Sequence, residues 1–339
     1  MQRFAIRMPG RVITVAWLAL ELLAAAALAA MPLAASAQAY PSRPIRWIVS
    51  FAAGSSYDVL SRTVAAQMAS AMGQPIVVEN RSGASGIVAT EFVAKSAADG
   101  YTLVSADNST YVYNPLLYRK LPYDADRDLQ PVGLLGGAPL FLTVAESTGL
   151  KSMKEFIEYV RANPGKMSYG SAGSGSIQHM SIELLKKAAG LDMVHVPYKG
   201  AALAVPDLIA GRIGVMILVY GTALPHVTSG KLRILATTDG ARAAMLPDTP
   251  TVSEAGLPGF EVPAWFGGVA APAGVPPEII ARLNQEVRRA SADPKVAARV
   301  REIGYTVPPA MDPQQIGEMY RKERVTWTPL IRSMAIALD

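Results

Sequence analysis

The sequence predicts an α/β protein of two lobes around a cleft, each lobe a mostly parallel β-sheet flanked by helices. Three observations predict this class. Short β-rich runs alternate with amphipathic helical stretches from Pro44 onward, and a second alternating series follows the Gly- and Pro-rich stretch 131–139. Half of the 339 residues are apolar, which is enough for one or two buried cores in a chain without cysteine. We expect residues 40–140 and 266–339 to form the first lobe and 141–265 the second.

The first 39 residues have the layout of a secretory signal peptide. Three arginines precede an apolar run from 12 to 31, and Ala37-Gln38-Ala39 presents the small residues of a cleavage site. An uncleaved membrane anchor is the alternative, because a run of this length can span a bilayer. Glu21 in the middle of the run and the many alanines disfavour an anchor. We therefore expect cleavage after Ala39 and a mature chain that starts at Tyr40.

The composition of the mature chain argues against a nucleic-acid partner. The formal charge of +5 includes three leader arginines and Glu21, without which 29 basic and 26 acidic residues leave a net charge of +3. No basic cluster is interleaved with aromatic residues. No cysteine follows the leader to carry a lipid, so we expect an exported protein that is free in solution.

The first alternating series starts the first lobe. Its expected elements are, in order, a strand at 45–51, a helix at 56–72, a strand at 75–78, a helix at 87–95 and a strand at 101–105. In the first helix Leu60, Val64 and Met68 share one face, and Gly73 ends it. Strands that alternate with helices in this way form parallel sheets covered by helices.

The second series has the same alternation. Its expected elements are a helix at 153–162, a strand at 167–170, a helix at 176–189, a strand at 194–197, a helix at 201–210, and strands at 213–219 and 232–237. Ser152 and Glu155 form a capping box for its first helix. The stretch 258–263 is again Pro- and Gly-rich, and from Pro277 we expect two long amphipathic helices on either side of 305–307.

Three strand-to-helix junctions consist mostly of small residues, at 51–58, 81–86 and 169–176. Unpaired N–H groups at a helix start, together with the helix dipole and serine hydroxyls, favour an anion such as a carboxylate. Each loop taken alone is also ordinary capping and turn chemistry. Because these loops follow strands in both lobes, where open α/β sheets bind ligands, we expect them to form a binding site together.

Eight short stretches spread over the mature chain carry a family pattern. They are YPSRPI (40–45), VVENR (77–81), DGYTL (99–103), LPYD (121–124), ANPGK (162–166), YGSAGSGS (169–176), HVPYKG (195–200) and GKLR (230–233). In these stretches the chain resembles the periplasmic receptors of the tripartite tricarboxylate transporter family, also called Bug receptors. The resemblance implies a type II-like Venus-flytrap fold that holds a small carboxylate through backbone amides, hydroxyls and bridging water.

The resemblance also implies a periplasmic, monomeric receptor that passes its ligand to the membrane subunits of a tripartite tricarboxylate-type transporter. A ligand sensor that presents a carboxylate to a signalling partner remains the alternative. The candidate ligand-contacting residues lie in the loops and at neighbouring strand ends: Phe51, Ala53, Gly54, Ser55, Ser56, Tyr57, Asp58, Ser85, Ser105, Asp107, Ser171, Ala172, Gly173, Ser174, Ser176, His179, Tyr198 and Tyr220.

Two departures from the family pattern bear on the ligand. The family usually has Pro-Gly-Gly where this chain has Ala53-Gly54-Ser55, followed by the bulky Tyr57. Acidic residues usual in a strand of the second lobe are replaced by Gly214 and by Leu218-Val219-Tyr220. A pocket without those carboxylates offers less to an ammonium group, so we expect a plain or aromatic carboxylate over an amino acid.

Catalysis is not expected, and neither is a cofactor or a metal. The serine-rich loop has no Gly-x-Ser-x-Gly elbow, and position 178 is Gln where a dinucleotide fingerprint needs a third glycine. The three histidines, His179, His195 and His226, lack metal-ligand spacing. His179 fits a packing or hydrogen-bonding role better than a ligand contact.

Overall fold

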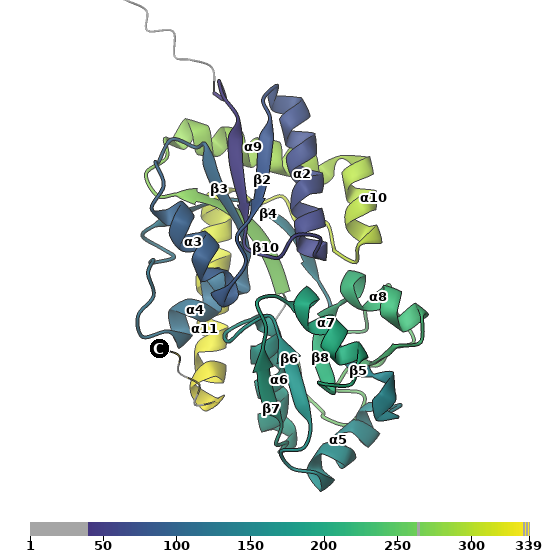
Figure 1. The fold of residues 1–339 in the computed structure, drawn as a ribbon. Helices are drawn as coiled ribbons and strands as arrows, with labels where there is room; N and C mark the ends of the chain where they lie inside the picture. Colours follow the sequence, from purple (N-terminus) through teal and green to yellow (C-terminus); the bar gives the residue numbers. More distant parts are fainter. Residues whose placement is uncertain (1–39, 263–264, 335, 337, 339) are drawn as a thin grey trace, which may run out of the picture. The chain divides into compact units, whose positions relative to one another are not determined.

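Two five-stranded sheets flanked by helices make up the fold, which confirms the predicted class (Figure 1). The computed structural model describes residues 40–262, 265–334, 336 and 338, so the predicted leader and its cleavage site lie outside the described residues. The strand orders are β2-β1-β3-β10-β4 and β7-β6-β8-β5-β9. None of the helices in the described part of the chain combines the length and the hydropathy that crossing a bilayer requires.

The first lobe, as the name is used below, is the sheet that contains β1 with its helices. Its strands are β1 (Ile45–Val49), β2 (Ile76–Asn80), β3 (Thr102–Asp107), β4 (Leu129–Ala138) and β10 (Trp265–Pro272). Its helices are α2 (Ser56–Met72), α3 (Ile87–Ala94), α4 (Asn114–Leu117), α9 (Pro277–Ala292), α10 (Pro294–Glu302) and α11 (Pro313–Met334), with a 3₁₀ turn η1 (Ala84–Gly86) and a π-helical turn η2 (Ser109–Tyr113).

The second lobe is the sheet that contains β6 with its helices. Its strands are β5 (Leu140–Ala145), β6 (Ser168–Ser171), β7 (Val194–Pro197), β8 (Val215–Val219) and β9 (Leu232–Thr237). Its helices are α5 (Met153–Ala162), α6 (Ile177–Ala189), α7 (Ala201–Ile209) and α8 (Tyr220–Thr228), with a 3₁₀ turn η3 (Glu146–Thr148). The chain passes from the first sheet to the second at Pro139 and returns between β9 and β10.

Both sheets are mostly parallel, as predicted, and each contains one antiparallel strand. In the first, β1 pairs in parallel with β2 and β3, whereas β10 is antiparallel to β3 and β4. In the second, β6 is parallel to β7 and β8, whereas β5 is antiparallel to β8 and β9. The antiparallel strand of each sheet, β10 in the first and β5 in the second, directly follows a crossing of the chain. The glycines and prolines of β4 and β10 resemble linker sequence, so neither strand was predicted.

The C-terminal segment contains three helices, where two were predicted. Asp293 ends α9 and caps α10, because its carboxylate accepts hydrogen bonds from the N–H groups of Lys295 and Val296. Pro294 then occupies the first helical position, where a missing N–H costs nothing. One predicted helix is therefore split by a cap.

Strand β10 brings the returning chain into the centre of the first sheet. Gly267 and Gly268 are neighbours in this strand, so their Cα hydrogens face opposite sides of the sheet. A Cβ on Gly267 would overlap the Tyr57 ring, and a Cβ on Gly268 would overlap the Tyr320 hydroxyl. Antiparallel pairing with β3 sets Gly267 opposite Asp107 at the carboxyl end of β3. The first residue of β10, Trp265, consequently lies at the edge where the parallel strands end.

Candidate ligand-binding site

Two adjoining hollows lie between loops of the two lobes, and they share Phe51, Gln178 and Gly200. We call them the aromatic hollow and the polar hollow, and together the interlobe cleft. The aromatic hollow is lined by Phe51, Ala52, Ser55, Ser56, Tyr57, Gln178, Gly200, Ala201, Ala202, Leu218, Val219, Thr222, Trp265 and Tyr305. The polar hollow is lined by Ser50, Phe51, Gly83, Ser85, Gly86, Asp107, Ser109, Ala172, Ser176, Gln178, Lys199 and Gly200.

The aromatic hollow has a wall of packed rings. Tyr57 lies 4.6 Å from Phe51 and 5.6 Å from Trp265 between ring centroids, and Trp265 lies 5.4 Å from Tyr305. The Tyr57 hydroxyl donates to the Ala106 carbonyl at 2.9 Å, which turns the phenol into the first lobe. No residue lining this hollow carries a formal charge. Such a wall suits an apolar or aromatic ligand body.

The polar hollow is rich in hydroxyl groups and has one carboxyl group on its wall. The Asp107 carboxyl accepts hydrogen bonds from the Trp265 indole at 2.8 Å and from the Ser109 N–H at 3.0 Å. Burial raises the pKa of Asp107, although these hydrogen bonds oppose the rise. Lys199, an exposed residue of the second lobe, supplies the cation among the lining residues.

The first predicted loop is fixed by Asp58. Ser55 caps α2 by accepting from the Asp58 N–H, while the Asp58 carboxylate accepts from the Gly54 N–H at 2.9 Å and from the Asn80 side chain at 2.8 Å. Burial alone would raise the pKa of Asp58, but hydrogen bonds from Arg62, Asn80 and Gly54 outweigh it and hold the pKa below its usual range. Asp58 therefore shapes the loop from inside the first lobe.

The second and third predicted loops meet across the cleft. The Ser85 hydroxyl donates to the Ser174 carbonyl at 2.7 Å, and the Tyr118 hydroxyl donates to the same carbonyl at 3.3 Å. Ala84 and Ser85 have φ angles of +44° and +47°, a left-handed conformation that costs a non-glycine residue about 1–2 kcal/mol. Backbone strain of this kind clusters at ligand clamps and switch regions.

The structure brings eight of the predicted site residues onto the walls of the cleft. These are Phe51, Ser55, Ser56, Tyr57, Ser85, Asp107, Ala172 and Ser176. The others lie behind or beside them: Ala53, Gly54, Asp58, Ser105, Ser171, Gly173, Ser174, His179, Tyr198 and Tyr220.

Three of these residues have partners outside the cleft. Ser105 is fully buried and bonds the Ser61 hydroxyl at 3.0 Å. The Tyr198 hydroxyl donates to Asp207, on α7. Tyr220 packs against Gly304 at the surface where the lobes touch.

Eight of the 23 lining residues were among the predicted site residues, and the other 15 were not. Trp265 and Tyr305 arrive from segments far along the chain, and no local pattern marks them. Gln178 could have been found, because it is the second residue of α6 and lies in the first turn of the helix predicted to start at Ser176. Gly200 and Ala201 also had a signal, since they form another junction of strand and helix at the end of the family stretch 195–200.

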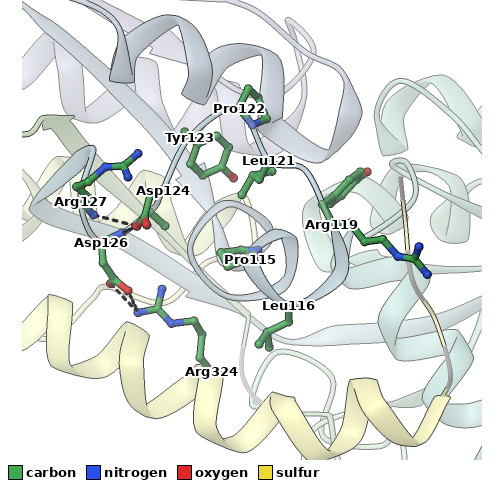
Figure 2. A pocket seen from close by; sticks show the side chains of 12 residues that line it. Pro115, Leu116, Arg119, Leu121, Pro122, Tyr123, Asp124, Asp126, Arg127 and Arg324 are labelled. Carbon is green, nitrogen blue, oxygen red and sulfur yellow. Dashed lines mark hydrogen bonds and ion pairs between the residues drawn. The ribbon is translucent and has the colours of Figure 1, made fainter.

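A larger hollow of about 580 Å³ lies on the first lobe (Figure 2). Its walls come from α4, the chain that leads to β4, and α11. Its charged groups already pair with neighbours, Arg324 with Asp126 and Arg127 with Asp128. The interlobe cleft, in contrast, lies at the carboxyl ends of parallel strands in both lobes, where open α/β sheets bind ligands.

Comparison with known proteins identifies the family. The sequence pattern of the tripartite tricarboxylate transporter family receptors matches residues 60–336. The chain belongs to this receptor family. Protein BugT of Bordetella pertussis is 36% identical over 304 residues, which cover 89% of this chain and 93% of BugT.

Two solved structures that align over nearly their whole length have the same fold. R. palustris Rpa4515 with adipate has a TM-score of 0.84 and 35% identity, covering 88% of this chain and 99% of that one. MatC from Rhodopseudomonas palustris with bound malate has a TM-score of 0.82 and 33% identity, covering 86% of this chain and all of that one (100%). Both likenesses extend over both lobes of the receptor.

Gly173 provides a test of the third loop. Its φ of +130° disfavours any side chain, and a Cβ there would lie 3.2 Å from the Ser85 hydroxyl. We expect Gly173→Val to lower the affinity for a bound carboxylate at least about tenfold, because the loop must move away from its partner across the cleft. Titration calorimetry measures the affinity, and circular dichroism reports folding.

Gly190 is the matched control. It has a φ of +63° at the other end of α6 and open space around it, so Gly190→Val introduces similar strain away from the cleft. We expect this variant to lose stability, by about 1–2 kcal/mol, and to keep its affinity. If Gly173→Val and Gly190→Val bind the carboxylate with equal affinity, loop 169–176 is not part of the binding site.

Proposed function

We propose that this receptor captures a small organic carboxylate in the interlobe cleft and hands it to the membrane subunits of a tripartite tricarboxylate-type transporter. The observation that carries the proposal is the meeting of helix-opening loops from both lobes around one hydroxyl-rich hollow. Family relatives whose structures contain adipate and malate support the carboxylate. We further propose that the protein acts as a monomer and has no catalytic role, as in a receptor family.

The cleft favours a carboxylate with an apolar body. The carboxylate of such a ligand would lie in the polar hollow, among the serine hydroxyls. Its apolar body would pack against Phe51, Trp265 and Tyr305 in the aromatic hollow. An amino acid fits less well. Both oxygens of Asp107 already accept hydrogen bonds from Trp265 and Ser109, so this carboxylate offers little to a ligand ammonium group.

The lobes must separate for a ligand to enter. The two hollows measure about 40 and 20 Å³, which is room for a few water molecules, whereas ligand pockets usually measure about 300–1,000 Å³. We propose that the two lobes move relative to each other about the crossings at Pro139 and between β9 and β10. Loops from both lobes then close on the ligand.

A carboxylate screen tests the function. We expect adipate, benzoate and phenylacetate to raise the melting temperature, because a ligand that binds only the folded state stabilises it by about 2.7 kcal/mol at a hundred times its Kd. Aspartate and glutamate serve as matched amino acids and should shift it little. If no carboxylate shifts the melting temperature, the proposed function is wrong.

Closure can be tested at Gly221, which does not line either hollow. This second-lobe glycine lies against the chain after α10, and a Cβ on it would overlap the Ile303 carbonyl oxygen. We expect Gly221→Ala to hold the lobes apart and lower ligand affinity about tenfold.

Gly221→Ala should lower the ligand affinity without lowering the stability of the fold. Gly221 lies inside α8, and alanine favours a helix by about 1 kcal/mol over glycine, so the melting temperature should stay level or rise. A variant that keeps its affinity would show that this contact is not part of the ligand-binding state.

We propose that the chain is exported to the periplasm and cleaved after Ala39. The arginines, the apolar run and the small residues before Tyr40 support this. N-terminal sequencing of the protein from a periplasmic fraction should start at or near Tyr40. Full-length chain recovered in the membrane fraction would contradict it.

A further inference from the structure

Three aromatic rings are stacked inside the second lobe, behind loop 169–176. The His195 ring packs against both Tyr169 and His179, at centroid distances of 4.9 and 4.1 Å and interplanar angles of 16° and 8°, and the Tyr169 and His179 centroids are 6.4 Å apart. His179 is 6% exposed, and Tyr169 is fully buried. None of the three lines the interlobe cleft.

Each histidine is bonded to the loop in front of it. Nε2 of His195 lies 2.6 Å from the Ser171 hydroxyl, which also bonds the N–H and the carbonyl of Gly173, both at 3.1 Å. Nδ1 of His179 accepts the Gly175 N–H at 3.1 Å. Both ends of the turn are therefore tied to imidazoles, immediately before the helix start at Ser176.

The hydrogen bond from Gly175 fixes the tautomer of His179. The Gly175 N–H can only donate, so Nδ1 of His179 must carry a lone pair and its proton must sit on Nε2. The Ser171 hydroxyl can donate to Nε2 of His195 or accept from it, so this contact is compatible with either neutral tautomer of His195. A proton added to Nδ1 of His179 would face the Gly175 N–H and break the hydrogen bond between them.

The surroundings keep these rings neutral. Burial, then His195 and Lys186, lower the pKa of His179 to about 3, and burial lowers the pKa of His195 to about 4 against the pull of Glu183. The charged and titratable groups that face the rings are Tyr169 from β6 and Glu183 and Lys186 from α6. Glu183 accepts from the Tyr169 hydroxyl and from Lys186.

We propose that His179 and His195 are positioning residues, which as neutral imidazoles hold loop 169–176 in the shape that presents it to the ligand. The proposal rests on the proposed function for its effect on binding. Packing alone does not explain the pair, because a phenylalanine ring would fill the same space without the cost of burying polar nitrogen atoms. Nδ1 of His179 bonds the Gly175 N–H, and Nε2 of His195 bonds the Ser171 hydroxyl. Phenylalanine has no atom that can form either hydrogen bond, whereas a side-chain amide of similar length has one.

The test compares variants that keep or remove the bonding atom. His179→Asn places an oxygen near the position of Nδ1, and His195→Gln places an NH₂ group near the position of Nε2, whereas His179→Phe and His195→Phe keep the ring alone. We expect each phenylalanine variant to bind the tightest carboxylate of the screen about tenfold more weakly. The asparagine and glutamine variants should stay within about threefold of the wild type. His226→Phe, on α8, is the control and should leave affinity unchanged.

A second readout needs no ligand, so it separates this proposal from the proposed function. Amide hydrogen exchange of Gly173 and Gly175, followed by NMR, should be slow in the wild type, fast in the matching phenylalanine variant, and slow again in His179→Asn and His195→Gln. Phenylalanine variants with wild-type exchange and wild-type affinity would overturn the proposal.

The imidazole ¹⁵N chemical shifts of the wild type report the charge and the tautomer of His179 without any substitution. We expect His179 to be neutral with its proton on Nε2 from pH 8 down to pH 5. A charged ring, or a proton on Nδ1, would overturn the proposal even if the phenylalanine variants fail to fold.

The pH dependence of folding has a definite sign. Because both folded pKa values lie below the ordinary 6.5, the unfolded chain binds more protons as pH falls below 6.5. Their contribution to stability is thus complete above about pH 6.5 and is lost as pH falls towards 4. The double variant His179→Asn/His195→Gln should lose less stability over pH 6.5–4.5 than the wild type, and an equal loss would contradict neutral burial of the pair.

Discussion

The hydrogen bond from the Trp265 indole to Asp107 connects the chain that returns from the second sheet to the ligand-facing edge of the first. It spans 158 positions in the sequence and lies beside a second long-range bond, from the Phe266 N–H to the Asn108 side chain at 2.7 Å. Together they fix the start of β10 at the carboxyl end of β3. The aromatic wall of the cleft, the position of Tyr57 and the route of the second crossing all depend on this junction.

The binding chemistry follows from how the loops are held. Asp58 shapes the first loop from within its lobe, and the paired imidazoles of His179 and His195 support the third. The lobes meet through few direct bonds, among them Ser85 to the Ser174 carbonyl. One such bond contributes about 1 kcal/mol, so closure without a ligand is weakly favoured and a ligand that bonds both lobes can control it.

Local features of the fold were predictable from the sequence, and long-range ones were not. The capping box at Ser152 and the helices predicted to start at Ser56 and Ser176 depend on short-range hydrogen bonding, and the structure has serine caps at Ser152, Ser55 and Ser176. Strands β4 and β10 escaped prediction because glycines that make room for neighbouring side chains look like linker sequence. Trp265 and Tyr305 reach the cleft only through pairing and turns far along the chain, for which no nearby residue provides a signal.

The central claim is that one carboxylate is held between two lobes that close on it. The chain contains no cysteine, so a spin label can be placed on each lobe by Val77→Cys on β2 and Tyr159→Cys on α5, both exposed positions. Electron–electron distance measurements with and without saturating adipate, or the tightest carboxylate of the screen, follow the separation of the lobes. The account predicts a broad distribution in the free protein that narrows to one shorter distance with ligand. An unchanged distribution under saturating, independently verified binding would contradict it.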